Sequence, residues 1–147
     1  MISAFCIAVG RFILTAKEIE MAYIFTNPNP KNQKVGDCVI RALSLAMNRS
    51  WREVYTELSL YGFSMSDMPS SNSVWDAMLR DHGFDRHVVS GQCADGCYTV
   101  RHFCEDHPHG VYVLGIGNHV VTAINGDYYD TWDSGDESPI YFYKERK

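Results

Sequence analysis

The stretch Gly36-Asp37-Cys38-Val39-Ile40-Arg41-Ala42-Leu43 is the starting point for predicting the fold. Cys38 follows a loop rich in Pro, Asn, Lys and Gly and begins a run of apolar residues at helical spacing. This pattern predicts a helix from about Cys38 to Met47. Unpaired backbone N–H groups at a helix N-terminus favour a thiolate over a thiol. Cys38 is therefore a candidate nucleophile, and an inert core thiol is the alternative for a cysteine taken alone.

Further helices are expected after this one. A capping box at Ser50–Glu53 opens the second, which we expect to end at Gly62. The third is capped by Asn72 or Ser73 and runs to about Asp81. Before the first helix, residues 25–34 are expected to form an extended, turn-rich lead-in, because each proline disfavours helix at the preceding residue.

From Gly110 onward the sequence favours strands. Asn125-Gly126 is a strong hairpin signal between two apolar runs. The expected strands are residues 110–116, 119–124, 128–132 and 140–143, with a shorter one at 87–89. Helices followed by an antiparallel sheet make an α+β layout, in a single domain over residues 21–147.

The hairpin register brings three side chains together. If Asn125-Gly126 is a two-residue loop, His119, Asp130 and Trp132 lie on one face. Asp130 is then the diagonal neighbour of His119, within reach of its imidazole. That bond favours the imidazolium, which stabilises a nearby thiolate. Trp132 would shield the pair from water, and Asp133 is the alternative orienting acid if the turn carries a bulge.

These residues resemble motifs of the papain-like cysteine peptidases. Gly36–Cys38 opens a helix, Asn118-His119 begins a strand, and Asp130-Thr131-Trp132 is similar to the Asn-Ser-Trp of papain. Asp37-Cys38 is similar to the Asp-Cys-Gly of the bacteriocin-leader peptidases, with Val39 in place of the glycine. The resemblance spans residues 32 to about 135, and small proteins of this type occur in bacteria and phages.

The resemblance implies a papain-like fold and a thiol hydrolase acting on a peptide or isopeptide bond through a thioester. Cys38 would be the nucleophile, His119 the base and then acid, and Asp130 the orienting residue. In those families a Gln about six residues before the cysteine donates to the oxyanion. Gln33 lies five residues before Cys38 and Asn32 six, so either is a candidate.

Other functions stay open. The same three residue types serve transglutaminases, amide deamidases and arylamine acetyltransferases in related folds. A binding or inhibitor module that keeps the fold is a further alternative. The short interval from His119 to Asp130 predicts a minimal hairpin, with little sheet to build a deep substrate cleft.

Composition narrows the function classes. The 147 residues carry a net charge of −5 and no basic stripe, which argues against nucleic-acid binding. Five cysteines without an export signal favour free thiols in a cytoplasm. The apolar run at residues 2–9 is too short to span a membrane and lacks a basic segment before it. A peptide or protein substrate is expected, with no cofactor.

Residues 1–20 are expected to be an N-terminal extension. Lys17-Glu18 can be encoded by AAGGAG, a bacterial ribosome-binding sequence, and Met21 follows at a suitable distance. We expect the functional chain to begin at Met21. A genuine N-terminal amphipathic helix is the alternative.

A second cluster has residue types that bind zinc, and it lies in a loop and a short helix capped by Thr99 that runs to Glu105. Its C-x3-C spacing is not that of a standard knuckle, and two of its members fall on different helix faces. We therefore expect no metal here. The cluster comprises Cys93, Cys97, His102, Cys104, His107 and His109.

Overall fold

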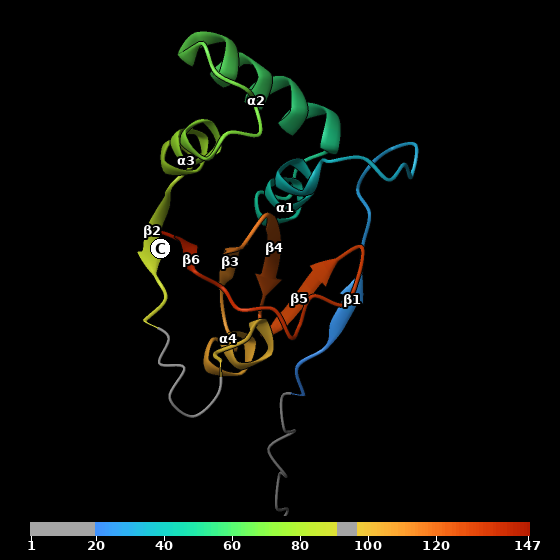
Figure 1. Cartoon of the computed structure of the whole chain (residues 1–147), viewed down its shortest axis with the longest axis vertical. Helices are drawn as coiled ribbons and strands as arrows, with labels where there is room; N and C mark the ends of the chain where they lie inside the picture. The colour runs from blue at the N-terminus through green and yellow to red at the C-terminus, as the bar shows by residue number, and fades with distance from the viewer. Residues whose placement is uncertain (1–19, 91–96) are drawn as a thin grey trace, which may run out of the picture.

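The computed structural model describes residues 20–90 and 97–147, and these contain four helices and a six-stranded sheet (Figure 1). The chain is therefore α+β, as predicted. The helices are α1 (Cys38–Ala46), α2 (Trp51–Met65), α3 (Asn72–Asp81) and α4 (Val100–Asp106). The strands are β1 (Tyr23–Phe25), β2 (Phe84–Val88), β3 (Val111–Ile116), β4 (His119–Ile124), β5 (Asp127–Asp130) and β6 (Tyr141–Glu145).

The sheet has the order β1-β5-β4-β3-β6-β2. Four of the neighbouring pairs are antiparallel, but β1 runs parallel to β5 with Tyr23 opposite Tyr128. The prediction of a purely antiparallel sheet was therefore wrong at this edge. The strand β1 was not predicted, because a strand of three residues is too short for alternation to be recognised.

Helices cover both faces of the sheet (Figure 1). On one face α1, α2 and α3 form a core with Val113 and Val120, and on the other α4 packs with Leu114 and Val121. The two valines of β4 are consecutive and point to opposite faces, as strand geometry requires. The N-terminal helices pack on the sheet as expected, and α4 lies on the far side from them.

One buried hydrogen bond joins α1 to β4, the helix and the strand on which the candidate site is built. Thr122 Oγ1 donates to the backbone oxygen of Ala42 over 2.8 Å, and Thr122 is fully buried. Because a helix carbonyl accepts this bond, the height of α1 over β4 is set by a directional contact as well as by packing.

The second helix is longer than its glycine suggested. Its capping box is present, with Ser50 and Glu53 bonding reciprocally. The predicted end at Gly62 was wrong, because α2 continues to Met65 and is terminated by Ser66 in a left-handed conformation with φ 54°. Gly62 instead permits a close approach, since a Cβ there would lie 2.7 Å from the backbone oxygen of Asp67.

Two tight hairpins place β4 between β3 and β5. Asn125 and Gly126 have φ values of 51° and 87°, and Ile124 lies opposite Asp127, as predicted. The preceding turn, Gly117–Asn118, sets Ile116 opposite His119. The fifth strand ends at Asp130, so the prediction that it continues to Trp132 was wrong: the chain leaves the sheet two residues earlier.

Some expectations fall outside the described residues. These are the N-terminal extension, apart from Glu20, and Cys93 with most of the predicted 90–96 loop. Within residues 20–90 and 97–147, none of the helices combines the length and the apolar character needed to cross a membrane.

Candidate active site

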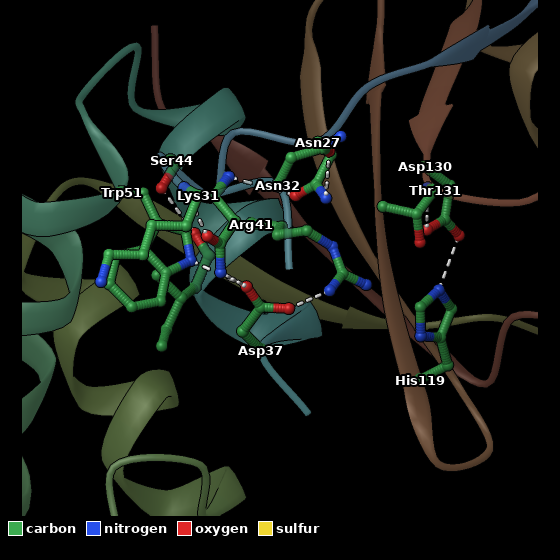
Figure 2. A network of polar contacts seen from close by, with 12 residues as sticks. Asn27, Lys31, Asn32, Asp37, Arg41, Ser44, Trp51, His119, Asp130 and Thr131 are labelled. Atoms are coloured by element: carbon green, nitrogen blue, oxygen red, sulfur yellow. Dashed lines mark hydrogen bonds and ion pairs between the residues drawn. The ribbon is translucent and has the colours of Figure 1, made fainter. Parts of the chain in front are cut away.

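The N-terminus of α1 carries Cys38, whose side chain is partly buried. The preceding N-cap residue, Asp37, makes no capping hydrogen bond to the helix. Its buried carboxylate accepts instead from Asn29 Nδ2 at 3.1 Å, from Trp51 Nε1 at 2.9 Å, and from Arg41 in an ion pair (Figure 2). The first N–H groups of α1 are therefore left without a side-chain cap.

The second part of the site is a histidine–carboxylate pair on β4 and β5 (Figure 2). His119 Nε2 lies 2.6 Å from Asp130 Oδ2, and Asp130 is only 4% exposed. Ser134 Oγ donates to the same oxygen at 2.7 Å, and the backbone N–H of Thr131 donates to Oδ1 at 2.7 Å. Two donors therefore hold a buried carboxylate against one nitrogen of the imidazole, and the pairing of His119 with Asp130 is the one that the hairpin register predicted.

The Cys38 thiol and the His119 imidazole lie close enough to act on each other's pKa. Asp130 occupies Nε2 of His119, so Nδ1 is the ring nitrogen that remains for Cys38. Residues 38, 119 and 130, which come from three separate elements, therefore form one continuous chain of side chains.

Burial and partners act in opposite directions on the imidazole. Burial lowers the pKa of His119, but the bonds to Asp130 and Cys38, with the charges of these two groups, outweigh it and raise the pKa to about 9. At neutral pH the imidazolium is therefore the favoured form.

The thiol responds in the opposite sense. Burial raises the pKa of Cys38, yet the hydrogen bond and charge of His119 bring the pKa below its ordinary value. The backbone N–H of Val120 and the charge of Arg41 act in the same direction. A lowered thiol pKa beside a raised imidazole pKa is the direction that favours a thiolate–imidazolium pair, the reactive state of a nucleophilic cysteine.

Trp132 lies beside the imidazole, where the expected register put it, but covers it only in part. The Trp132 ring lies 5.3 Å from the His119 ring, centroid to centroid, but 43% of the residue is exposed, so it shields one side of the imidazole. Asp133 turns away from the site. It forms an ion pair with Arg101 at 2.8 Å and accepts from the hydroxyl of Tyr128.

The two expected oxyanion donors lie beside the site without bonding to the thiol. Asn32, at φ 51°, accepts from Asn27 Nδ2 over 3.0 Å. Gln33 makes no side-chain hydrogen bond among the described residues. Both line a cavity that also contains Arg41 and Trp132, the neighbours of the thiol and of the imidazole.

Sequence reasoning missed three residues that shape the site. Ser134 was read only as part of a turn, although its hydroxyl supports Asp130. Asn29 belongs to the predicted lead-in, where nothing in the sequence marked it as a site residue, and its side chain donates to Asp37, the N-cap residue of α1. Arg41 could have been found, because it follows Cys38 by three positions on a helix and therefore lies on the same face.

The second cysteine–histidine cluster does not converge where it is described. Cys104 is buried, and burial raises its pKa to about 12. His102 Nδ1 accepts from the backbone N–H of Thr99 as part of a helix cap, and His107 stacks on Phe103. Among residues 20–90 and 97–147, no three His, Cys, Asp or Glu side chains are placed to hold a metal ion.

Comparisons of the chain with protein-family models, with curated proteins and with solved structures found no match. What the site can do is therefore inferred from its geometry and its chemistry.

Proposed function

We propose that the protein is a cysteine hydrolase of papain-like architecture that cleaves a peptide or isopeptide bond. One observation carries the proposal: Cys38, at an uncapped helix N-terminus, has its pKa lowered by His119, and His119 is held by the buried carboxylate of Asp130. A nucleophile, a base within hydrogen-bond reach and a third group that orients the base are the parts of an acyl-transfer site.

In the first half of the reaction the Cys38 thiolate attacks the carbonyl carbon of the amide. The carbonyl π electrons move to oxygen, and the C–N bond then breaks as His119 Nδ1 gives its proton to the leaving amine. The products are a thioester on Cys38 and a free amine. A His119 pKa of about 9 keeps that proton available at neutral pH.

Backbone N–H groups support the developing oxyanion. The N–H of Cys38 lies at the first position of α1, where no intrahelical carbonyl accepts it. The amide of Gln33 or of Asn32, on the wall of the neighbouring cavity, is the candidate second donor. Donors aimed at the oxyanion stabilise the transition state more than the ground state.

In the second half, neutral His119 accepts a proton from water as the water oxygen attacks the thioester carbonyl. The C–S bond breaks, the carboxylic acid leaves, and Cys38 returns as thiolate beside the imidazolium. Asp130 keeps the ring in one tautomer through both halves, because its bond to Nε2 leaves Nδ1 to shuttle the proton.

The test is to trap the thioester. The protein is mixed with a panel of activated peptide esters and quenched in acid, and the acylated residue is found by mass spectrometry of its peptides. We expect one acyl group on Cys38 and none on buried Cys104, whose raised pKa makes it an internal control.

Hydrolysis that persists in Cys38→Ala would overturn the proposal. An acyl-enzyme that transfers only to added amines, and never to water, would assign the site to an acyltransferase instead.

A further inference from the structure

A hollow of about 350 Å³ adjoins the candidate active site, between the lead-in loop and the end of β5. It meets the site at two points, because Trp132 contacts His119 and the charge of Arg41 acts on Cys38. Its lining combines two apolar walls, Phe25 and Trp132, with side chains that can donate hydrogen bonds: Gln33, Lys34, Arg41 and Thr131.

Arg41 has unused donors in this hollow. The residue is only 9% exposed, and its Nη1 bonds to Asp37. In the part of the chain that the structure describes, Nε and Nη2 have no acceptor, and Figure 2 shows the second terminal nitrogen turned away from Asp37. Among the described residues, every buried side-chain nitrogen or oxygen has a hydrogen-bond partner. Because Nε and Nη2 have none, both atoms must be accessible to solvent, and Arg41 lines the hollow. The unused Nε–Nη2 edge has the geometry that binds a carboxylate through two parallel bonds.

The charge around the hollow is positive. Asp37 balances the charge of Arg41 through its Oδ1 atom. The other oxygen of this carboxylate, Oδ2, accepts hydrogen bonds from Asn29 and Trp51. Lys34 is exposed on the lining and makes no ion pair within residues 20–90 and 97–147. Within the same ranges no acidic side chain lines the hollow, although the chain has a net charge of −5. Lys34 therefore supplies net charge, and Arg41 supplies directed donors.

We propose that this hollow is a specificity subsite for an acidic residue of the substrate. The carboxylate would bind the Nε–Nη2 edge of Arg41, with Lys34 at the rim, and the aliphatic part of the residue would lie against Trp132. The proposal rests on the proposed function, because it assumes that a peptide reaches Cys38. It goes further by naming the substrates: peptides with Glu or Asp near the bond that is cut.

The experiment compares peptidyl chloromethyl ketones that alkylate Cys38. Glu and its neutral isostere Gln are placed in turn at each of three positions nearest the reactive carbon, and the second-order rate of alkylation is measured. At one position we expect Glu to react about ten-fold faster than Gln, as a charge-assisted bidentate pair would give. The ratio of the Glu rate to the Gln rate should fall toward one in Lys34→Gln and in Arg41→Lys. The second variant keeps a cation beside Asp37.

Lys31→Gln is the matched control, because Lys31 belongs to the same loop but does not line the hollow. An equal loss of preference in this variant would mean long-range attraction and would overturn the subsite. Equal rates for Glu and Gln at all three positions would also overturn it, while leaving the hydrolase proposal intact. No alkylation of Cys38 by any ketone, or by iodoacetamide, would overturn the hydrolase proposal and the subsite with it.

Discussion

The hydrogen bonds of His119 control its pKa and the ring nitrogen that carries the mobile proton. Asp130 bonds to Nε2, and Ser134 and the Thr131 N–H fix the carboxylate in turn. The carboxylate therefore acts on Cys38 through the imidazole: it raises the pKa of His119, and the charge of the ring lowers the pKa of the thiol. A substitution of Asp130 should therefore change the pKa of Cys38 in proportion to its effect on the pKa of His119.

The first prediction separates the two candidate acids. Asp130→Ala should slow alkylation of Cys38 by iodoacetamide near pH 7 roughly ten-fold, the effect of about one pKa unit. Asp130→Asn should slow it less, because the amide can still orient the ring. Asp133→Ala should stay within about two-fold, since Asp133 pairs with Arg101 and lies outside the chain of bonds. The measurement is the alkylation rate of each variant against pH, and a flattened profile in Asp133→Ala alone would show that the acids have been assigned the wrong way round.

A second prediction concerns Ser134, which the sequence did not single out. Ser134→Ala removes one donor from a buried carboxylate and should lower the pKa of His119, because Asp130 can then turn away from the ring. The histidine titration, followed by NMR, should shift downward by a few tenths of a unit to about one unit. Ser59→Ala is the control, because the Ser59 hydroxyl donates to the Tyr55 oxygen on the surface of α2 and makes no bond to the pair. A His119 titration that is the same in Ser134→Ala as in the unchanged protein would contradict the supporting role.

At the scale of elements, the site depends on how α1 sits on β4. The helix supplies Cys38, the strand supplies His119 and the Val120 N–H that reaches the thiol, and Thr122 bonds the two elements together. Two hairpins of two residues each hold β4 in register, so the histidine cannot slide relative to β5.

Thr122→Val should therefore weaken both the fold and the site. It leaves the buried oxygen of Ala42 without its side-chain donor, at a cost of about 1–3 kcal/mol in the free energy of unfolding. Thr56→Val is matched chemistry in an exposed place, because Thr56 Oγ1 donates to the Arg52 oxygen on the surface of α2, and it should cost less than about 0.5 kcal/mol. Chemical denaturation of both variants checks this. Equal losses would show that the Thr122 bond has no special part in joining α1 to β4.

Elements with strong local signals were predictable, and those set by distant partners were not. The capping box correctly predicted the start of α2 after Ser50, and the Asn-Gly turn correctly predicted the end of β4 and its register with β5. Each of these signals depends on neighbouring residues alone. The strand β1 was missed because its three residues show no alternation and its partner, β5, lies about a hundred residues away. The place of α4 on the opposite face was not stated for a similar reason, since the order of elements does not fix the face that each one covers.

Over the whole molecule, a sheet between two helical layers brings residues 38, 119 and 130 to one place. The His119–Asp130 pair was predictable from the hairpin register, because a hairpin depends on residues that are close in the sequence. That Cys38 meets the pair depends on α1 packing over β4, which only the full fold specifies. The hollow beside Arg41 is a global feature too: its lining comes from three segments that the sequence separates.

Stability against pH should report the histidine–carboxylate pair in Cys38→Ala, where no thiolate competes. In the folded protein the pKa of His119 lies above its ordinary value of 6.5, and it is about 9 when Cys38 is present. The pair therefore contributes its full stabilisation of the folded state below pH 6.5. This contribution is lost as the pH rises through the folded pKa. Each unit of elevation is equivalent to about 1.4 kcal/mol. The melting temperature of Cys38→Ala should fall over this window, and that of Cys38→Ala with Asp130→Asn should fall less. Parallel curves for the two proteins would contradict the assignment.

The most direct measurement is the ionisation of Cys38 itself, followed by the ultraviolet absorbance of its thiolate against pH, with Cys38→Ser subtracted. The interaction with His119 lowers the pKa of Cys38 even though burial raises it. The unchanged protein should therefore show a thiolate below the ordinary cysteine value of about 8.5. In His119→Ala burial remains and the lowering partner is gone, so the transition should move upward to about that value or beyond. Identical transitions in the two proteins would contradict the thiolate–imidazolium pair on which the proposed chemistry depends.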